Sequence, residues 1–213
     1  MNLLKYISAK FSSQILLVSF DKDSQLYHES EVYHKLKPFE SKRHDRQVEN
    51  MISHKLIAKL TKRSNIPAYL KDEFGKPHLR DDHRHISISH SDNMACAIIS
   101  DVSVGIDVQV HTQKLASIKE KFVSEEKLKV IDQAHQLESL HILWGAKEAM
   151  YKAYGKKQLR FKTDLLVQAF KYANKMGHTY GWVSKNQEKE RYSIYYEKIN
   201  DNYLVFAIAD PEL

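Results

Sequence analysis

The chain has 213 residues and a net charge of +6, with 42% hydrophobic and 28% charged residues. The 12 tyrosines and 8 phenylalanines argue against a disordered chain, and no apolar run approaches the length of a membrane span. A single cysteine excludes an internal disulfide and suits a reducing cytoplasm. The positive net charge should attract a polyanion, which could be nucleic acid, a phosphorylated cofactor or an acidic protein.

The first part of the chain predicts a strand followed by a long helix. Residues 15–20 form a short apolar run that suits a buried strand. No small-residue cleavage site follows this run, so we do not interpret it as a signal peptide and expect a cytoplasmic protein. Between residues 39 and 62, apolar side chains recur at helical spacing: Val48, Met51, Ile52, Leu56, Ile57 and Leu60.

Three basic residues stand near the start of this helix: Lys42, Arg43 and Arg46. They are either a basic, solvated turn or a clamp for phosphate groups. The second interpretation rests on the guanidinium group, which presents a fork of donors that matches phosphate oxygens. The residues alone leave both interpretations open.

A turn and a hairpin are expected next. Residues 75–77, Gly-Lys-Pro, are typical of a turn. Residues 86–91 then alternate between apolar and polar, Asp92 and Asn93 offer a hairpin turn, and residues 94–100 return as a second strand.

A third strand is expected at residues 102–110, where valine and isoleucine occupy every second position. Asp107 and Gln109 then project together from the opposite face. They are a natural pair of oxygen ligands for a hard cation such as Mg²⁺. The alternative is an ordinary strand with one solvated polar face, and for the alternation taken alone this is the more frequent explanation.

The strongest helix prediction covers residues 137–154, with Gly155 as its C-terminal cap. Charged and aromatic residues at offsets of 3, 4, 7 and 8 should share one side of it: Trp144, Lys147, Glu148, Tyr151 and Lys152. The alternative is a solvated face with a Glu148–Lys152 pair, which contributes only about 0.3–0.5 kcal/mol.

The remaining segments are predicted more briefly. Ser124 is expected to be the N-cap of a short helix. Strands are expected at residues 178–184, 191–199 and 203–209, whereas residues 161–170 are ambiguous. We find no internal sequence repeat and no obvious linker.

Four separated motifs occur in a fixed order within residues 39–165. They are Gly75-Lys76-Pro77, Ser87-Ile-Ser89-His90-Ser91, Gly105-Ile-Asp107-Val-Gln109 and Trp144-x-x-Lys147-Glu148-Ala-x-x-Lys152-Ala-x-Gly155. Each is weak alone, but the ordered set resembles the 4′-phosphopantetheinyl transferases, specifically the single-chain Sfp-type group.

The resemblance implies an α+β fold of two similar halves related by pseudo-twofold symmetry. Each half would hold an antiparallel sheet packed with a long helix, and the active site would lie between them. The halves would be residues 1–102, which contact coenzyme A, and residues 103–213, which carry the metal and catalytic residues. The implied reaction transfers the phosphopantetheine arm of coenzyme A to a serine hydroxyl of an acyl or peptidyl carrier protein, leaving adenosine 3′,5′-bisphosphate. We expect a monomer.

The resemblance also implies roles for the central residues. Asp107 and Glu148 would hold Mg²⁺, or Mn²⁺, against the pyrophosphate, and Glu148 is also the candidate general base. Lys152 would meet the negative charge that develops on the leaving phosphate. Many Sfp-type members carry a second acid at the position of Gln109, whose amide oxygen would be a weaker metal ligand or be replaced by water.

Coenzyme A would be bound by a second group of residues. Lys76 and His90 would contact its phosphates with support from Ser89, and the basic residues Lys42, Arg43 and Arg46 would face its nucleotide end. Lys147 would touch phosphate or the acidic carrier. The basic surface suits both polyanionic coenzyme A and an acidic carrier protein.

Two other functions are compatible with parts of this sequence. One is a member of the same fold that binds coenzyme A or a carrier without transferring the arm, supported only by Gln109. The other is a basic nucleic-acid-binding protein, which would leave the order of the motifs unexplained, and no helix-turn-helix, zinc-finger or RNP motif supports it. We therefore expect no nucleic-acid partner and no membrane association.

Overall fold

The computed structural model describes residues 1–9, 11–22, 44–64, 67–129, 131–156 and 158–211. These residues form two compact units, Met1–Asp101 and Val102–Leu213. Each unit contains one antiparallel sheet and at least one long helix, so the predicted α+β class is confirmed. Among the described residues, no helix combines the length and apolar character needed to cross a membrane.

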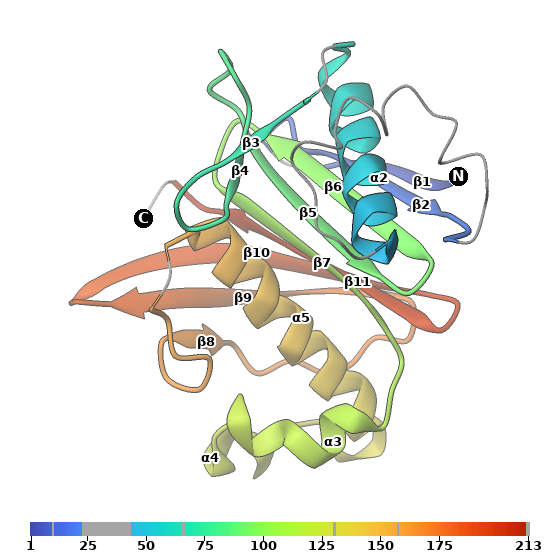
Figure 1. Cartoon of the computed structure of the whole chain (residues 1–213). Coiled ribbons are helices and arrows are strands. Elements are labelled where there is room, and N and C mark those ends of the chain that lie inside the picture. Colours follow the sequence, from blue (N-terminus) through green and yellow to red (C-terminus); the bar gives the residue numbers. More distant parts are fainter. Residues whose placement is uncertain (10, 23–43, 65–66, 130, 157, 212–213) are drawn as a thin grey trace. The chain divides into compact units, whose positions relative to one another are not determined.

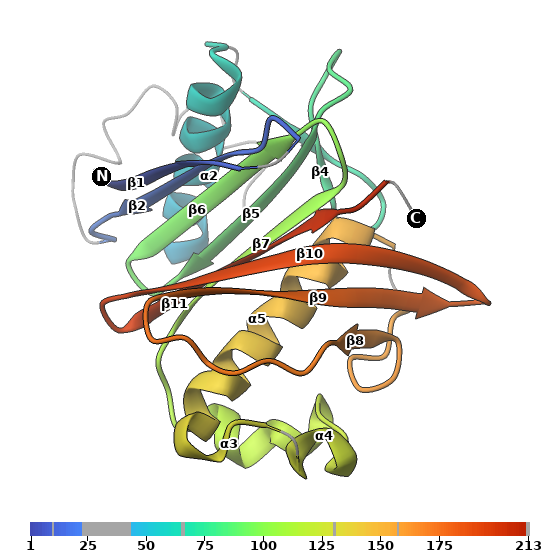
Figure 2. The same cartoon turned by 180° about the vertical axis from the view of Figure 1, so that it is seen from behind.

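The first unit is a six-stranded antiparallel sheet with helix α2 (His44–Thr61) packed on one face (Figures 1 and 2). The strand order is β1-β2-β6-β5-β4-β3. The strand bounds are β1 (Asn2–Ser8), β2 (Gln14–Ser19), β3 (Leu70–Lys71), β4 (Pro77–His78), β5 (His85–Ser91) and β6 (Met94–Ser100).

Periodicity accounts for most of this unit. The apolar positions expected on the helix are all buried in the core between α2 and the sheet. The predicted hairpin corresponds to β5 and β6, and its turn residue Asp92 has a positive φ of 50°. The sequence did not predict β1, because Leu3 and Leu4 remain exposed and the strand forms by pairing with β2. Lys42 and Arg43 lie outside the described residues.

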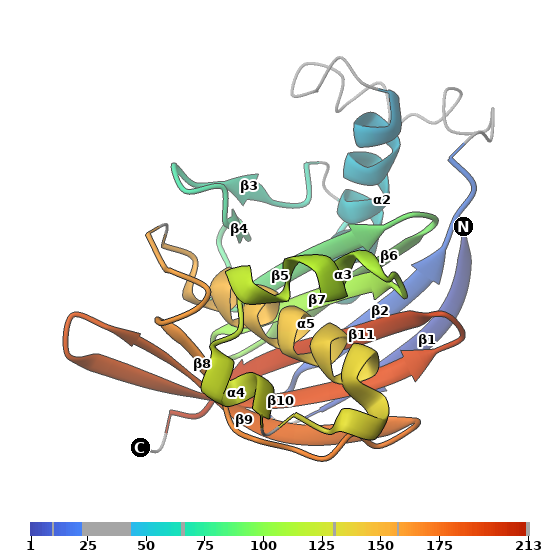
Figure 3. The ribbon, with the colours of Figure 1, turned by 90° about the horizontal axis from the view of Figure 1, so that it is seen from below.

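The second unit is a five-stranded antiparallel sheet in the order β7-β11-β10-β9-β8. Helix α5 (Gln136–Tyr154) crosses one face of it, and the short helices α3 and α4 are found beside α5 (Figures 1 and 3). The other bounds are β7 (Val104–Val110), α3 (Lys114–Ile118), α4 (Glu125–Lys129), β8 (Leu165–Val167), β9 (Met176–Lys185), β10 (Glu188–Ile199) and β11 (Asn202–Ala209), with 3₁₀ turns at Lys119–Lys121 and Gln133–His135.

Local signals define the helices of this unit. Gly155 caps α5 in the left-handed conformation, with φ 71°, and its N–H donates to the carbonyl of Tyr151 at 3.0 Å, as the sequence predicted. Ser124 Oγ lies 3.4 Å from the backbone nitrogen of Lys127, as expected for an N-cap. The ambiguous segment 161–170 contributes only the short strand β8.

The same strand connectivity occurs in both units, although the sequence shows no repeat. In each unit, one strand precedes the long helix in the chain. The strands that follow the helix each pair with the next one, and the last of them pairs with the strand that precedes the helix. This gives β2-β6-β5-β4-β3 in one unit and β7-β11-β10-β9-β8 in the other. β1 is an additional strand at the edge of the first sheet. The spatial twofold relation between the units stays a prediction.

Candidate active site

Asp107 of β7, an edge strand of the second sheet, forms an ion pair with Lys152 of α5. Lys152 Nζ lies 2.8 Å from Asp107 Oδ1 and 2.9 Å from the carbonyl oxygen of Ile106. Asp107 is buried, with 7% of its surface exposed, because its face of the strand packs against the helix. The alternative of a solvated polar face on this strand is therefore wrong.

Two glycines let the helix approach the sheet closely enough for this contact. A Cβ at Gly105 would lie 1.8 Å from the carbonyl oxygen of Ala149, and a Cβ at Gly145 would lie 2.6 Å from Val205 Cγ2. No real Cβ tolerates such distances. Gly105 belongs to a motif that the sequence singled out, whereas the role of Gly145 was missed, because nothing local distinguishes it from a helix glycine of no consequence.

Glu148 lies one turn before Lys152 on the same helix and shares its electrostatic environment. Burial raises the pKa of Glu148, the negative charge of Asp107 raises it further, and the positive charge of Lys152 opposes both. Two carboxylates are thus held near each other in a partly buried region beside one ammonium group. Such a region favours the binding of a proton or a cation.

The residues present fit a magnesium ion in part. Carboxylate oxygens are the ligands that Mg²⁺ prefers, and Mg²⁺ is commonly held by one or two carboxylates together with water and substrate phosphates. Asp107 and Glu148 can supply those two carboxylates. Within the described part of the chain, no group of three or more His, Cys, Asp or Glu residues could hold a metal, so other oxygens would have to complete its coordination.

Gln109 occupies the expected face of β7 but is bonded to other protein groups. Its Oε1 lies 3.0 Å from Nδ1 of His141, while its Nε2 lies 3.1 Å from the His141 carbonyl oxygen and 3.4 Å from Asp107 Oδ2. The expectation that its amide oxygen is a metal ligand does not match this arrangement. His141, which the sequence did not single out, is fully buried, and burial lowers its pKa to about 4.

The residues expected on one side of α5 separate into two neighbouring stripes. Glu148 and Lys152 belong to the stripe that faces β7. Trp144 and Tyr151 lie beside Phe161, with ring centroids 5.4 and 5.5 Å away. This second stripe covers the chain segment that leads into β8, and the interpretation of α5 as one solvated charged face is wrong because most of the helix is buried.

Lys147 belongs to the second stripe and not with Glu148. Its Nζ donates to the carbonyl oxygens of Phe161 at 2.5 Å and Leu165 at 2.6 Å. Burial, followed by the charge of Lys127, lowers the pKa of Lys147 to about 8. With 5% of the residue exposed, this ammonium group stabilises the backbone of residues 161–165.

The candidates in the first unit lie on β5, on α2 and in the turn before β4. His90 Nδ1 lies 3.3 Å from Glu49 Oε2, and Glu49 Oε1 lies 3.3 Å from Lys22 Nζ. Ser89 is buried on the other face of β5, and Arg46 is exposed in the first turn of α2. The sequence missed Glu49, although it stands three residues after Arg46, within reach of the same helix surface.

Lys76 lies in a tightly bonded turn. Its backbone N–H donates to Asp72 Oδ1 at 2.9 Å, and Gly75 beside it has a φ of +87°, which side chains rarely adopt. The predicted turn is thus confirmed. That the candidates of the first unit meet those of the second at one site stays a prediction.

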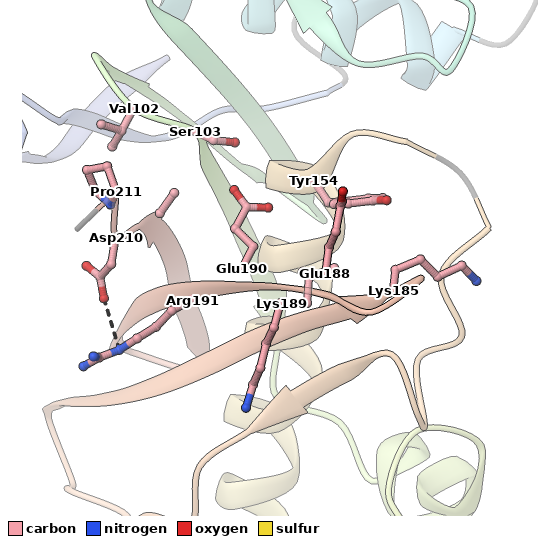
Figure 4. Close-up of a pocket in the computed structure, with 12 residues that line it drawn as sticks. Val102, Ser103, Tyr154, Lys185, Glu188, Lys189, Glu190, Arg191, Asp210 and Pro211 are labelled. Atoms are coloured by element: carbon pink, nitrogen blue, oxygen red, sulfur yellow. Dashed lines mark ion pairs between the residues drawn. The ribbon is translucent and has the colours of Figure 1, made fainter. Parts of the chain in front are cut away.

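A pocket of about 440 Å³ in the second unit contains none of these candidates (Figure 4). Charged residues of both signs line it, including Lys185, Glu190 and Arg191. Arg191 is partly neutralised by Asp210, with Nε 3.4 Å from Oδ2. The pocket therefore offers no single charge that would select a ligand, and we assign it no role.

Comparison with known proteins identifies what the Asp107 region resembles. Residues 103–205 match the family model of the 4′-phosphopantetheinyl transferase superfamily. A protein named 4′-phosphopantetheinyl transferase gsp, from Aneurinibacillus migulanus, is 30% identical over 146 residues, which cover 65% of this chain and 58% of that protein. The chain thus spans less than two thirds of the length of this relative.

Proposed function

We propose that this chain is an Sfp-type member of the 4′-phosphopantetheinyl transferase superfamily, whose family model its residues 103–205 match, and that it transfers the 4′-phosphopantetheine arm of coenzyme A to a carrier protein. The acceptor is a serine hydroxyl of an apo acyl or peptidyl carrier. The serine oxygen forms a bond to the phosphorus that bears the arm, the pyrophosphate P–O bond breaks, and adenosine 3′,5′-bisphosphate leaves. The basic chain suits an acidic carrier.

The convergence of Asp107, Glu148 and Lys152 within the matched region carries this proposal. Asp107 and Glu148 would hold Mg²⁺, which neutralises phosphate charge when bound. Glu148 accepts the proton of the serine hydroxyl, and its raised pKa makes it a better proton acceptor than an exposed glutamate. Lys152 supplies positive charge for the leaving phosphate.

The first unit would bind coenzyme A. We assign its phosphates to Lys76 and His90 and its nucleotide end to Arg46, together with Lys42 and Arg43. The carboxylate of Glu49 supports this assignment for His90, because it lies 3.3 Å from Nδ1 and would hold the ring in place. Ser89 would support His90 by holding the backbone of β5 in place, since its own side chain is buried.

Intact-mass spectrometry of an apo carrier protein tests the proposal directly. The carrier is incubated with this protein, coenzyme A and Mg²⁺, and we expect a mass gain equal to one phosphopantetheine group. The gain should disappear with EDTA and with Glu148→Ala. No gain on acyl and peptidyl carriers would contradict transfer, and coenzyme A binding measured by calorimetry would then identify a protein that binds the cosubstrate without transferring its arm.

A further inference from the structure

The side chain of Gln109 bridges two elements of the second unit. It projects from β7 on the same face as Asp107 and contacts His141, which lies on α5 seven residues before Glu148. Its Nε2 lies near two oxygens, the His141 carbonyl at 3.1 Å and Asp107 Oδ2 at 3.4 Å. Its Oε1 lies 3.0 Å from the Nδ1 atom of the His141 ring.

Chemistry determines which way this amide points. A backbone carbonyl and a carboxylate only accept hydrogen bonds, so the group that faces both of them must be the NH₂ of Gln109. Oε1 of Gln109 therefore faces the His141 ring as an acceptor, so Nδ1 carries the ring hydrogen. Nε2 of His141 then accepts the backbone N–H of Thr112 at 3.1 Å, and the Thr112 carbonyl oxygen lies 3.3 Å from the same nitrogen. Reversing the amide would place like groups together on both sides.

We propose that Gln109 and His141 are positioning residues that set the direction of the Asp107 carboxylate, and that Gln109 is not a metal ligand. The His141–Gln109 pair approaches Oδ2 of Asp107, while Lys152 approaches Oδ1 at 2.8 Å. Donors from two elements thus hold the carboxylate from both sides. This inference rests on the proposed function for the role of Asp107, but the bonds within the pair do not depend on it.

Packing makes the pair rigid. The His141 ring is fully buried and stacks on Tyr203, with centroids 4.6 Å apart, and on His111 at 5.1 Å. A Cβ at Gly145 would lie 2.8 Å from Nε2 of Gln109, so this amide fills the space that the helix glycine leaves. An amide held by three groups and enclosed in this way has little freedom to turn its oxygen toward an ion.

The first test uses the protein without metal, in EDTA. Urea unfolding is measured for Gln109→Met, His141→Phe and the double variant, since methionine keeps the length of glutamine and phenylalanine keeps the stacking ring. Each single variant raises the unfolding constant by some factor. We expect the factor for the double variant to be roughly fivefold smaller than the product of the two single factors, because both changes remove the same bond. If the factor for the double variant equals the product of the two single factors, the two side chains share no bond and the proposal is contradicted.

The second test measures Mn²⁺ binding by electron paramagnetic resonance in the presence of coenzyme A. We expect Gln109→Met and His141→Phe to weaken Mn²⁺ affinity alike, by roughly tenfold, as changes behind a metal ligand do. His141→Asn, whose amide can still donate to Gln109, should retain the wild-type affinity. Asp107→Asn should bind weakest.

The outcomes separate the alternatives. Loss of affinity in Gln109→Met with wild-type affinity in His141→Phe would show that Gln109 itself is the ligand and overturn the proposal. Wild-type affinity in both variants would overturn the positioning role. A wild-type protein that neither binds Mn²⁺ nor modifies any carrier would contradict the proposed function instead, and the metal-free test would still decide whether the pair exists.

Discussion

Gly105 and Ala149 set the separation between strand β7 and helix α5. A Cβ at position 105 would lie 1.8 Å from the Ala149 carbonyl oxygen, a backbone atom that cannot move without shifting the helix. The strand therefore passes directly beneath the helix, and the next residue on the same face, Asp107, comes within reach of Lys152. The close packing of the strand and helix backbones is therefore what allows Asp107 and Lys152 to form their ion pair.

Substitution of Gly105 should consequently damage both stability and activity. We expect Gly105→Ala to lower the free energy of unfolding by about 3 kcal/mol, because the clash is with backbone. Gly75→Ala is the control: that position has open space, and only its positive φ should cost about 1 kcal/mol. Urea unfolding measures both, and equal losses would contradict the close-packing argument.

The ion pair of Asp107 should matter for catalysis more than for folding. We expect Lys152→Met to reduce the transfer rate at least about 100-fold while the circular dichroism spectrum is unchanged. The matched control is Lys156→Met, four residues later in the chain, where the lysine is exposed. A rate for Lys152→Met within a few-fold of the wild type would remove Lys152 from the active site.

Lys147 should be needed for local order and not for chemistry. Its ammonium group holds the carbonyls of Phe161 and Leu165, so Lys147→Met should accelerate hydrogen exchange in residues 161–167. We expect the transfer rate at saturating coenzyme A to stay within a few-fold of wild type. A large loss of rate with unchanged exchange would instead support the phosphate contact that the family resemblance implies.

His54 should make the first unit sensitive to acid. Its Nδ1 accepts the N–H of Ala68 at 3.1 Å and its ring stacks on Tyr69 at 4.0 Å, and burial lowers its pKa to about 4. The unfolded state binds the proton at higher pH than the folded state, so stability is complete above about pH 6.5 and falls as the pH drops toward 4.

The loss attributable to His54 should reach up to about 3 kcal/mol over this window. Urea unfolding between pH 4 and 7 measures it, and in His54→Asn the slope with pH should be smaller. His83→Gln, which changes an exposed histidine, should leave the slope as in the wild type. An unchanged slope in His54→Asn would contradict the assignment.

Much of the fold could be predicted because its signals are local. The period of the apolar residues predicted α2, and Gly155 identified the end of α5 through the left-handed conformation of its backbone. Alternation along residues 102–110 placed Asp107 and Gln109 on one face. The order of four short motifs indicated the resemblance to the 4′-phosphopantetheinyl transferases, since each motif is a continuous stretch of the chain.

Contacts between distant residues decided the rest. Strand β1 exists because β2 offers it a partner, and no alternation of its own predicts it. Helical spacing grouped Lys147 with Glu148, but the lysine instead donates to the carbonyl oxygen of Phe161, 14 residues later in the chain. Sequence spacing gives the direction of a side chain only to within a helix face, whereas hydrogen bonding and packing select its partner.

Gln109 shows most clearly how the folded chain selects a partner that the sequence could not predict. The residue type alone left its amide oxygen available to a metal, and its position on β7 agreed with that role. Only the folded chain brings His141, 32 residues later, to 3.0 Å from that oxygen. The sequence determined most of the elements and the family that this protein resembles. The tertiary structure determined which atoms of its candidate site face one another, because directional bonds form only after packing has fixed the distances.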